Sequence, residues 1–247
     1  MSTSGKLIIL SGPSCAGKSP LIKALALFHP DLHARLQSLV LYNSRSPRPG
    51  ERDGVDYHFR LRSDIEALRE RDNFVVLDVR GDLQALDLTE LVRLLERGDV
   101  LFEGNPFVGS LLLTHEKLAG IGKISAFLAP LSRDEVEHLR GQQGVDLQAL
   151  VTDVMRRKLL RRMQKQKGLL SLRDLEEIER RAGSAYGELR YAVDFQHVIP
   201  NHDGEDSENW SAFYHLLGDA RKSLDAFATL LRGGESEWVE SWKGMEL

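Results

Sequence analysis

The chain has 247 residues, 42% of them hydrophobic and 28% charged, which suits one sizeable globular domain with a single large core. Its formal net charge of −4 argues against general attraction to nucleic acid or to an anionic membrane. The single cysteine, Cys15, excludes an intrachain disulfide framework, and no stretch approaches the roughly 20 apolar residues that span a bilayer. Because no signal peptide is visible, we expect the protein to reside in the cytoplasm.

The first half of the chain alternates short apolar runs with helical patterns. The predicted strands lie at residues 7–10, 39–42, 57–61 and 74–79. The predicted helices are one that carries Leu21, Ile22, Leu25 and Phe28, one from an N-cap at Ser63 to about Arg71, and one over 83–97 that Gly98 stops. The segment 43–56, rich in Pro, Gly, Arg and Ser, predicts a loop.

The second half continues this alternation and ends in helices. Strands are predicted at 100–102, 124–128 and 195–199. Predicted helices lie between the first two strands, after a capping box at Ser132 and Glu135, over 146–167 and 172–190, and along an amphipathic stretch that carries Trp210, Phe213, Leu217, Ala220, Leu224, Phe227 and Leu231. This alternation predicts an α/β fold with a mostly parallel sheet. The last residues, 233–247, form either a docked tail or a flexible end.

A phosphate-binding loop is the strongest motif. Gly12, Pro13, Ser14, Cys15, Ala16, Gly17, Lys18 and Ser19 match G-x-x-x-x-G-K-[ST] at every required position, after a buried-type strand and before a helix. Glycine lets several backbone N–H groups point at one anion, and the helix N-terminus adds partial positive charge. Lys18 supplies a charge for the β- and γ-phosphates of ATP, and Ser19 a hydroxyl for Mg²⁺. We interpret Cys15 as a space-filler.

The motifs together resemble the guanylate kinase family. Besides the phosphate loop, Ser46-Pro-Arg-Pro-Gly-Glu-Arg-Asp-Gly-Val-Asp-Tyr-His-Phe59 resembles the acceptor-binding segment of that family, and looser similarity extends to Phe127–Ser132 and Asp194–Asn201. The resemblance covers roughly residues 5 to 203. It implies a three-layer P-loop NTPase sheet in one domain, with the following parts: a core (5–42 and 98–145), an acceptor-binding subdomain (43–97), a helical lid (146–192), a final strand and helix (193–232) and the tail.

The same resemblance assigns the acceptor site. It implies that Arg45, Arg48 and Tyr57 grip the phosphate of the acceptor, which agrees with the affinity of arginine forks for phosphate. The positions where the family bonds guanine fall on Val76 and Ala85, neither of which can hydrogen-bond a base with its side chain. Asp78 can substitute if the strand register slips. We therefore expect the phosphate grip to be retained and guanine recognition to be altered.

Donor and lid residues follow from the same comparison. A carboxylate at the end of a strand can hold a Mg²⁺-bound water, and we nominate Glu103 with Ser19 for the metal, with Asp78 second. Asn201, in the last matching segment, is assigned to ATP binding. The lid of the family closes with arginines over the transferring phosphoryl group, and we nominate Arg157, Arg161 and Arg181, alongside Lys18, as catalytic.

These features predict an ATP- and Mg²⁺-dependent transferase that moves the γ-phosphoryl group to the phosphate of a small acceptor, most simply a nucleoside monophosphate, with GMP implied by the family. Two alternatives stay open: a kinase of another phosphorylated small molecule such as a sugar phosphate, and a non-catalytic module that binds phosphorylated ligands. No nucleic-acid or membrane partner and no structural metal are expected, and the oligomeric state is left open.

Overall fold

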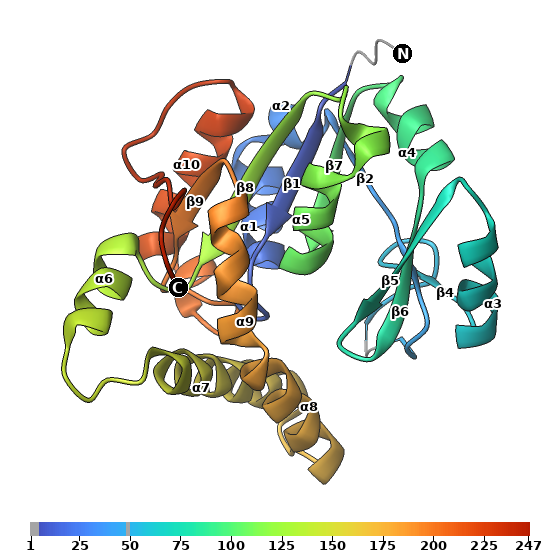
Figure 1. The fold of residues 1–247 in the computed structure, drawn as a ribbon. Helices are drawn as coiled ribbons and strands as arrows, with labels where there is room; N and C mark the ends of the chain where they lie inside the picture. Colours follow the sequence, from blue (N-terminus) through green and yellow to red (C-terminus); the bar gives the residue numbers. More distant parts are fainter. Residues whose placement is uncertain (1–4, 48–49) are drawn as a thin grey trace. The chain divides into compact units, whose positions relative to one another are not determined.

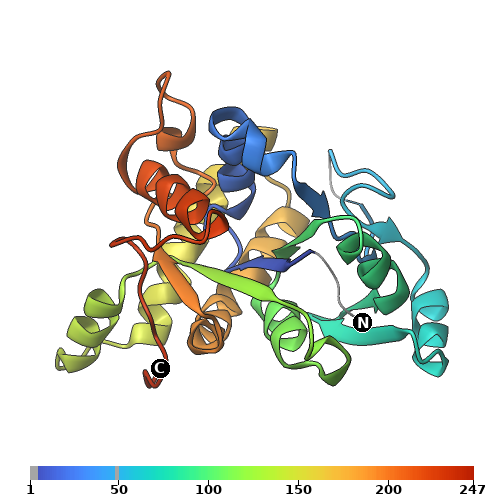
Figure 2. The same cartoon turned by 90° about the horizontal axis from the view of Figure 1, so that it is seen from above.

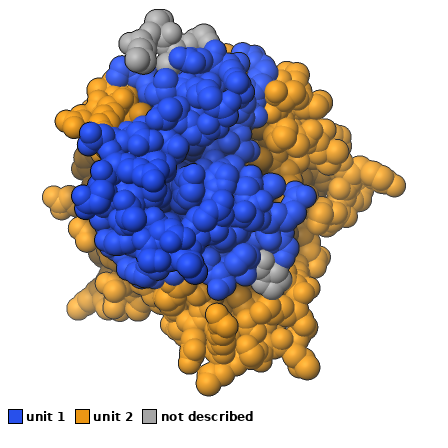
Figure 3. Space-filling view, turned by 90° about the vertical axis from the view of Figure 1, so that its right-hand side faces the viewer, with its two compact units in different colours: residues 1–8, 35–102, 120–123 blue, residues 9–34, 103–119, 124–247 orange. Residues whose placement is uncertain are grey.

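The computed structural model describes residues 5–47 and 50–247 and divides the chain into two compact units, which Figure 3 colours separately. Unit 1 comprises residues 1–8, 35–102 and 120–123, and unit 2 comprises 9–34, 103–119 and 124–247. The expected acceptor-binding subdomain, 43–97, falls within unit 1, and the expected lid, 146–192, falls within unit 2.

A five-stranded, mostly parallel sheet carries the phosphate loop. Its strands, in spatial order, are β2 (Leu36–Ser38), β7 (Asp99–Gly104), β1 (Leu7–Ser11), β8 (Lys123–Ala129) and β9 (His197–Pro200). All five residues of β1 are buried, which confirms the buried strand predicted from the apolar run at residues 7–10. The pairings of β2 with β7 and of β8 with β9 are parallel. The predicted α/β class with a mostly parallel sheet is therefore confirmed.

Helices flank the strands of unit 2, as Figure 2 shows for α1 and α10 on one side of β8 and β9 and for α9 on the other. Its helices are α1 (Lys18–Phe28), α2 (Pro30–His33), α5 (Pro106–Thr114), α6 (Arg133–Gly141), α7 (Leu147–Lys167), α8 (Leu172–Gly183), α9 (Ala185–Leu189) and α10 (Gly218–Leu231), with 3₁₀ turns at Glu116–Leu118, Arg190–Asp194 and Glu208–Trp210. The predicted capping box of α6 is present, with Ser132 and Glu135 bonding each other's backbone N–H groups.

The two charged helices, α7 and α8, run side by side as a hairpin (Figure 1). Asp146 caps α7, and Gly168 ends it with a positive φ of 74°, which favours glycine. Ser171 then opens α8 through a second capping box with Asp174. Both helices were predicted. The helix predicted over 172–190, however, ends at Gly183, and α9 begins at Ala185 after Ser184.

Unit 1 contains a second sheet, in which a hairpin is the main element. In spatial order its strands are β4 (His58–Phe59), β3 (Tyr42–Asn43), β6 (Asp82–Asp87) and β5 (Phe74–Val79), accompanied by α3 (Arg62–Glu66), a 3₁₀ turn (Ala67–Glu70) and α4 (Leu88–Leu95). Ile65 of α3 and Leu83 and Ala85 of β6 form a buried cluster beneath this sheet.

Three predictions for unit 1 were wrong. Residues 39–41 are not a strand, because the chain forms the short strands β2 and β3 on either side of them. The predicted helix 83–97 begins at Leu88, since Arg80 and Gly81 both take positive φ and close a tight β-hairpin that converts 82–87 into a strand. Ser63 lies inside α3, whose N-cap is Leu61.

The C-terminal prediction was right only in part. The helix starts at Gly218, and the side chain of Phe213, which was placed on its apolar face, is 70% exposed. The tail is docked: Val198 of β9 exchanges two backbone hydrogen bonds with Glu240, and the indole of Trp242 is fully buried. Among residues 5–47 and 50–247, no helix has the length and apolar character to cross a bilayer.

Candidate active site

The phosphate loop joins β1 to α1 in a conformation that depends on two of its glycines. Gly12 (φ 152°) and Gly17 (φ 103°) lie in the region that favours glycine. A Cβ on Gly12 would come within 2.4 Å of the carbonyl oxygen of Leu128, and one on Gly17 within 2.6 Å of Nδ2 of Asn201. The two glycines are therefore required by both torsion and space, as the motif predicts.

The first turn of α1 offers an anion site. Its N-cap, Gly17, provides no side chain to accept from the N–H groups of the turn, which stay available to phosphate oxygens. Lys18 is buried, and its ammonium donates hydrogen bonds to the carbonyl oxygens of Gly12 (2.7 Å) and Pro13 (2.8 Å). These two hydrogen bonds hold the positive charge of Lys18 against the backbone of the loop. Pro20 lies in the same first turn, where a missing N–H costs nothing.

Ser19 and Glu103 meet as predicted, although 84 residues separate them. The hydroxyl of Ser19 donates to Oε1 of Glu103 at 2.7 Å, where β7 ends beside the loop. Burial raises the pKa of Glu103, and the hydrogen bond from Ser19 and the charge of Lys18 oppose that shift. A hydroxyl and a carboxylate at this distance fit Mg²⁺, which takes its remaining ligands from water and phosphate oxygens.

Asn201, outside the phosphate loop, and Cys15, within it, support the structure of the loop. The side chain of Asn201 donates to the carbonyl oxygen of Ala16 at 2.8 Å, while its backbone N–H bonds Ala129, so Asn201 braces the loop from β9. Burial, with a smaller contribution from Glu205, raises the pKa of the Cys15 thiol to about 12. A thiol with that pKa stays protonated, which agrees with a space-filling role and not with a nucleophile.

Of the three nominated arginines, Arg181 contacts the phosphate loop. It is buried on α8, and its Nε donates to Oγ of Ser14 at 3.2 Å. A guanidinium held against the loop is suited to stabilise negative charge on a bound phosphate. Through this hydrogen bond, Arg181 connects the α7–α8 hairpin to the phosphate loop.

The other two arginines have different surroundings. Arg161 binds the buried carboxylate of Asp206, with both Nε and Nη2 at 2.7 Å from Oδ2. Arg157 lies on the exposed surface of α7 and pairs with Asp153 at 2.8 Å. Neither contact involves the phosphate loop, so these two nominations depend on the family resemblance alone.

Sequence reasoning missed the acidic segment that holds α7. Glu205 pairs with Arg162, Lys158 donates to the carbonyl oxygen of His202 at 2.8 Å, and Lys165 donates to that of Asp206 at 2.7 Å. The segment also contacts the loop directly, since the N–H of Glu205 bonds Cys15. The signal was present in the run Asp203-Gly-Glu-Asp-Ser-Glu208, whose charge complements the basic helix.

In unit 1, Arg45 and Tyr57 form the expected cluster. The carboxylate of Glu51 grips Arg45 with two hydrogen bonds of 2.6 and 2.7 Å, and the guanidinium lies over the rings of Tyr57 (5.2 Å) and Phe59 (5.5 Å). These contacts fix the orientation of the guanidinium, which is the requirement for bidentate phosphate binding. Arg48, predicted to belong to the same cluster, lies outside the described residues.

The predicted base positions lie against the core of unit 1. Val76 and Ala85 face each other across the hairpin and belong to the cluster around Ile65 of α3. Asp78, on the same strand, is exposed and pairs with Arg62 (3.6 Å) and Arg69 (3.5 Å). The apolar character of Val76 and Ala85 therefore has a packing explanation.

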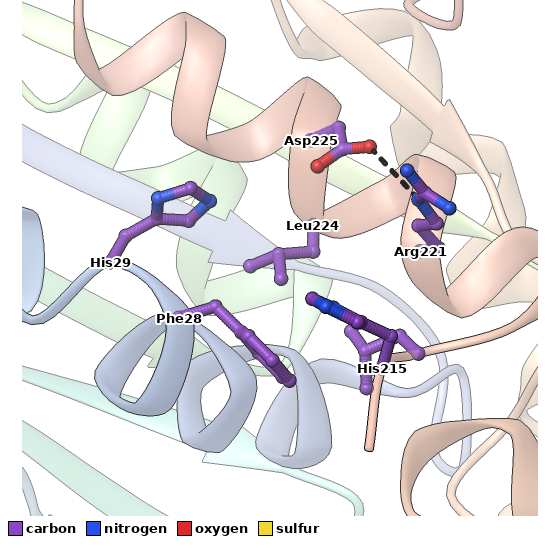
Figure 4. A pocket seen from close by; sticks show the side chains of 7 residues that line it. Phe28, His29, His215, Arg221, Leu224 and Asp225 are labelled. Carbon is purple, nitrogen blue, oxygen red and sulfur yellow. Dashed lines mark ion pairs between the residues drawn. The ribbon is translucent and has the colours of Figure 1, made fainter. Parts of the chain in front are cut away.

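A separate pocket of about 220 Å³ lies at the far end of α1 from the phosphate loop. Figure 4 shows the side chains that line it, among them the rings of Phe28 and His215, which stack at 5.5 Å, and the ion pair of Arg221 with Asp225. Because α1 rises about 1.5 Å per residue, the pocket is roughly 15 Å from the loop and does not belong to the anion site.

Comparison with known proteins agrees with this geometry. The family model for guanylate kinase matches residues 4–87. The guanylate kinase of Aromatoleum aromaticum is 32% identical over 202 residues, which are 81% of this chain and 81% of that protein. The chain belongs to the guanylate kinase family. It is accordingly an enzyme, a phosphotransferase of the nucleoside monophosphate kinase type.

Other members of the guanylate kinase family support this membership. The guanylate kinase of Nitrosococcus oceani is 29% identical over 208 residues, covering 82% of this chain and 83% of that protein. The crystal structure of guanylate kinase from Anaplasma phagocytophilum matches with a TM-score of 0.54 at 16% identity, over 94% of this chain and 87% of that one. The last comparison shows a shared fold.

Proposed function

We propose that this member of the guanylate kinase family transfers the γ-phosphoryl group of ATP to the phosphate of a nucleoside monophosphate, with GMP as the acceptor that the name of its relatives suggests. The observation that carries the proposal is the hydrogen bond of Ser19 with Glu103 beside the buried Lys18. This set supplies the cation, the hydroxyl and the carboxylate that a triphosphate with its metal requires.

The residues divide the chemistry between them. Backbone N–H groups of the loop and the ammonium of Lys18 bind the β- and γ-phosphates, and Arg181 stabilises charge on the transferring group. Ser19 and Glu103 would hold Mg²⁺, which would supply positive charge beside the phosphate oxygens. An oxygen of the acceptor phosphate forms the new P–O bond to the γ-phosphorus as the bond to the β-phosphate bridging oxygen breaks, which releases ADP.

In unit 1, Arg45 and Tyr57 would hold the phosphate of the acceptor, with Glu51 fixing the guanidinium. We extend the proposal to Arg48 on the resemblance alone. Transfer requires that the acceptor bound by unit 1 meets the triphosphate bound by unit 2, and this encounter needs no protein nucleophile. The protein is expected to act in the cytoplasm on small phosphorylated molecules.

The two alternative functions lose support. A sugar-phosphate kinase was suggested by Val76 and Ala85, whose apolar side chains pack against the core of unit 1. A non-catalytic binding module has no need for Lys18 and Ser19 in their observed arrangement.

The proposal is tested by ADP release, coupled to NADH oxidation, with a panel of GMP, AMP, CMP and UMP at saturating ATP and Mg²⁺. Release that depends on one of these acceptors is expected. A folded protein that releases no ADP with any of them contradicts the proposal, and titration of ATP·Mg²⁺ in a calorimeter then separates a binding module from a protein without nucleotide affinity.

A further inference from the structure

The acidic segment after β9, residues 203–208, lies directly against the phosphate loop. The N–H of Glu205 donates to the carbonyl oxygen of Cys15 at 3.4 Å. A Cβ on Gly204 would come within 2.4 Å of the same oxygen, so the segment passes too close to the loop for any residue but glycine at that position. The segment therefore places carboxylates beside a site that binds anions, where their charge opposes an anionic ligand.

The charge of Glu205 is felt at the loop and at the predicted metal site. Its side chain is 9% exposed. Burial is the main cause that raises the pKa values of Cys15 and Glu103, and the charge of Glu205 raises both further. The charge of Arg162, which pairs with Glu205, lowers both pKa values by less. The pair therefore presents its negative member to the phosphate loop.

Helix α7 turns a row of cations toward the acidic segment. They are spaced by three and four residues and so lie on one face of the helix: Lys158, Arg161, Arg162 and Lys165. The two arginines pair with the carboxylates of Asp206 and Glu205, and the two lysines donate to backbone carbonyl oxygens. A face of this kind beside a phosphate loop suits phosphate oxygens as well as carboxylates.

The two carboxylates are incompletely bonded in this arrangement. Oε2 of Glu205 faces Nη1 of Arg162 but, like Oδ1 of Asp206, it is buried and accepts no hydrogen bond from the part of the chain that the structure describes. Buried acceptors normally have such a partner. Because a phosphate binds a guanidinium fork in the same bidentate manner and carries more negative charge, it can replace Glu205 as the partner of Arg162.

We propose that Glu205 is an internal competitor of the bound triphosphate: in the free protein its carboxylate holds the guanidinium of Arg162, and ATP must break this pair to bring the guanidinium to its own phosphates. The inference rests on the proposed function and adds a regulation of the same site. After the exchange, Glu205 stays beside the phosphates without its partner, and its charge weakens ATP binding. The contact is therefore autoinhibitory and raises the ATP concentration at which the site fills.

The experiment measures binding by calorimetry, so that it does not depend on turnover. ATP with Mg²⁺ is titrated into the full chain and into Glu205→Gln, which keeps the shape of the side chain and removes its charge. We expect the variant to bind ATP about tenfold more tightly than the parent protein, because the ion pair no longer has to be broken and the repulsion is gone.

A matched variant on the same segment separates this contact from a general effect of charge. Glu208 lies three residues further along, its side chain is 80% exposed, and it lies 3.6 Å from Lys165. Glu208→Gln removes the same charge at an exposed position and should change the Kd of ATP by less than about twofold.

A measurement on the unaltered chain covers the case in which Glu205→Gln does not fold. Backbone hydrogen exchange is followed by mass spectrometry with and without ATP and Mg²⁺. Transfer of Arg162 to the phosphates removes one anchor of the acidic segment, so amides of residues 203–208 should exchange faster when ATP is bound, while those of residues 12–19 exchange more slowly.

The inference is overturned if Glu205→Gln binds ATP like the parent protein or more weakly, since Glu205 would then support the site. It is also overturned if Glu208→Gln gains as much affinity, or if residues 203–208 exchange equally fast or more slowly with ATP bound. Failure of the proposed function differs from these outcomes: ATP then binds with the predicted dependence on Glu205, but no phosphoryl group reaches any nucleoside monophosphate.

Discussion

The ion pair between Asp206 and Arg161 provides a direct test of how α7 is held in unit 2. Asp206 is 7% exposed and accepts a hydrogen bond from Nε of Arg161, whose Nη2 lies 2.7 Å from the same oxygen. Burial lowers the pKa of the nearby Lys158, and the charge of Asp206 opposes that shift. Asp206→Asn keeps the shape of the side chain and removes the charge. The substitution therefore asks whether α7 is anchored by this segment.

The magnitude follows from the burial of the two partners. Removing one partner of a fully buried pair costs about 3–5 kcal/mol, whereas exposed pairs contribute about 0–1 kcal/mol. Because the side chain of Arg161 is 55% exposed, we expect an intermediate cost of about 2 kcal/mol. For a chain of this size that cost corresponds to a fall in Tm of about 4–8 °C.

Thermal and urea unfolding of Asp206→Asn measure this cost, and Asp153→Asn is the matched control. Asp153 pairs with Arg157 on the same helix, but both side chains are more than half exposed, so its loss should change stability by less than about 0.5 kcal/mol. The reasoning would be refuted by equal effects of the two substitutions, or by a Tm for Asp206→Asn within about 1 °C of the parent. Either result would mean that Asp206 does not anchor α7.

Three further predictions concern other parts of unit 2. Arg181→Lys keeps the charge but loses the fork, and should lower kcat by about a hundredfold or more with Tm little changed; an unchanged kcat would exclude Arg181 from the reaction. Burial lowers the pKa of His202, but its bonds with Asp219 and Glu135 prevail and raise it above 6.5. The stabilisation is therefore complete below pH 6.5 and is lost as pH rises through the raised pKa, so His202→Gln should flatten this pH dependence of urea unfolding; an equal slope in the variant would contradict the assignment. Trp242→Ala removes a fully buried indole and should cost about 3–5 kcal/mol in unfolding free energy, which a flexible tail would not show.

Much of unit 2 could be predicted because its signals are local. The phosphate loop needs its residues in one order along eight positions, and the buried strand before it is a continuous apolar run. The capping box at Ser132 and Glu135 is equally local. The meeting of Ser19 with Glu103 could be anticipated because carboxyl ends of neighbouring parallel strands share one edge of the sheet.

Unit 1 was harder to predict because strand register decides which side chains face a ligand. The turn at Arg80 and Gly81 was not recognised, and its hairpin moved Ala85 from an expected helix to a strand opposite Val76. Since a shift of one residue exchanges the two faces of a strand, sequence alone could not show that Val76 and Ala85 face the core of unit 1.

The most direct test of the central claim is to follow the phosphoryl group itself. Full-length protein is incubated with γ-labelled ATP, Mg²⁺ and GMP, and the products are separated by chromatography. The account predicts that the label appears in GDP, and that Lys18→Met abolishes this transfer while leaving the fold intact by circular dichroism. Label that stays in ATP or appears only as inorganic phosphate, with the protein folded and GMP bound, would contradict it.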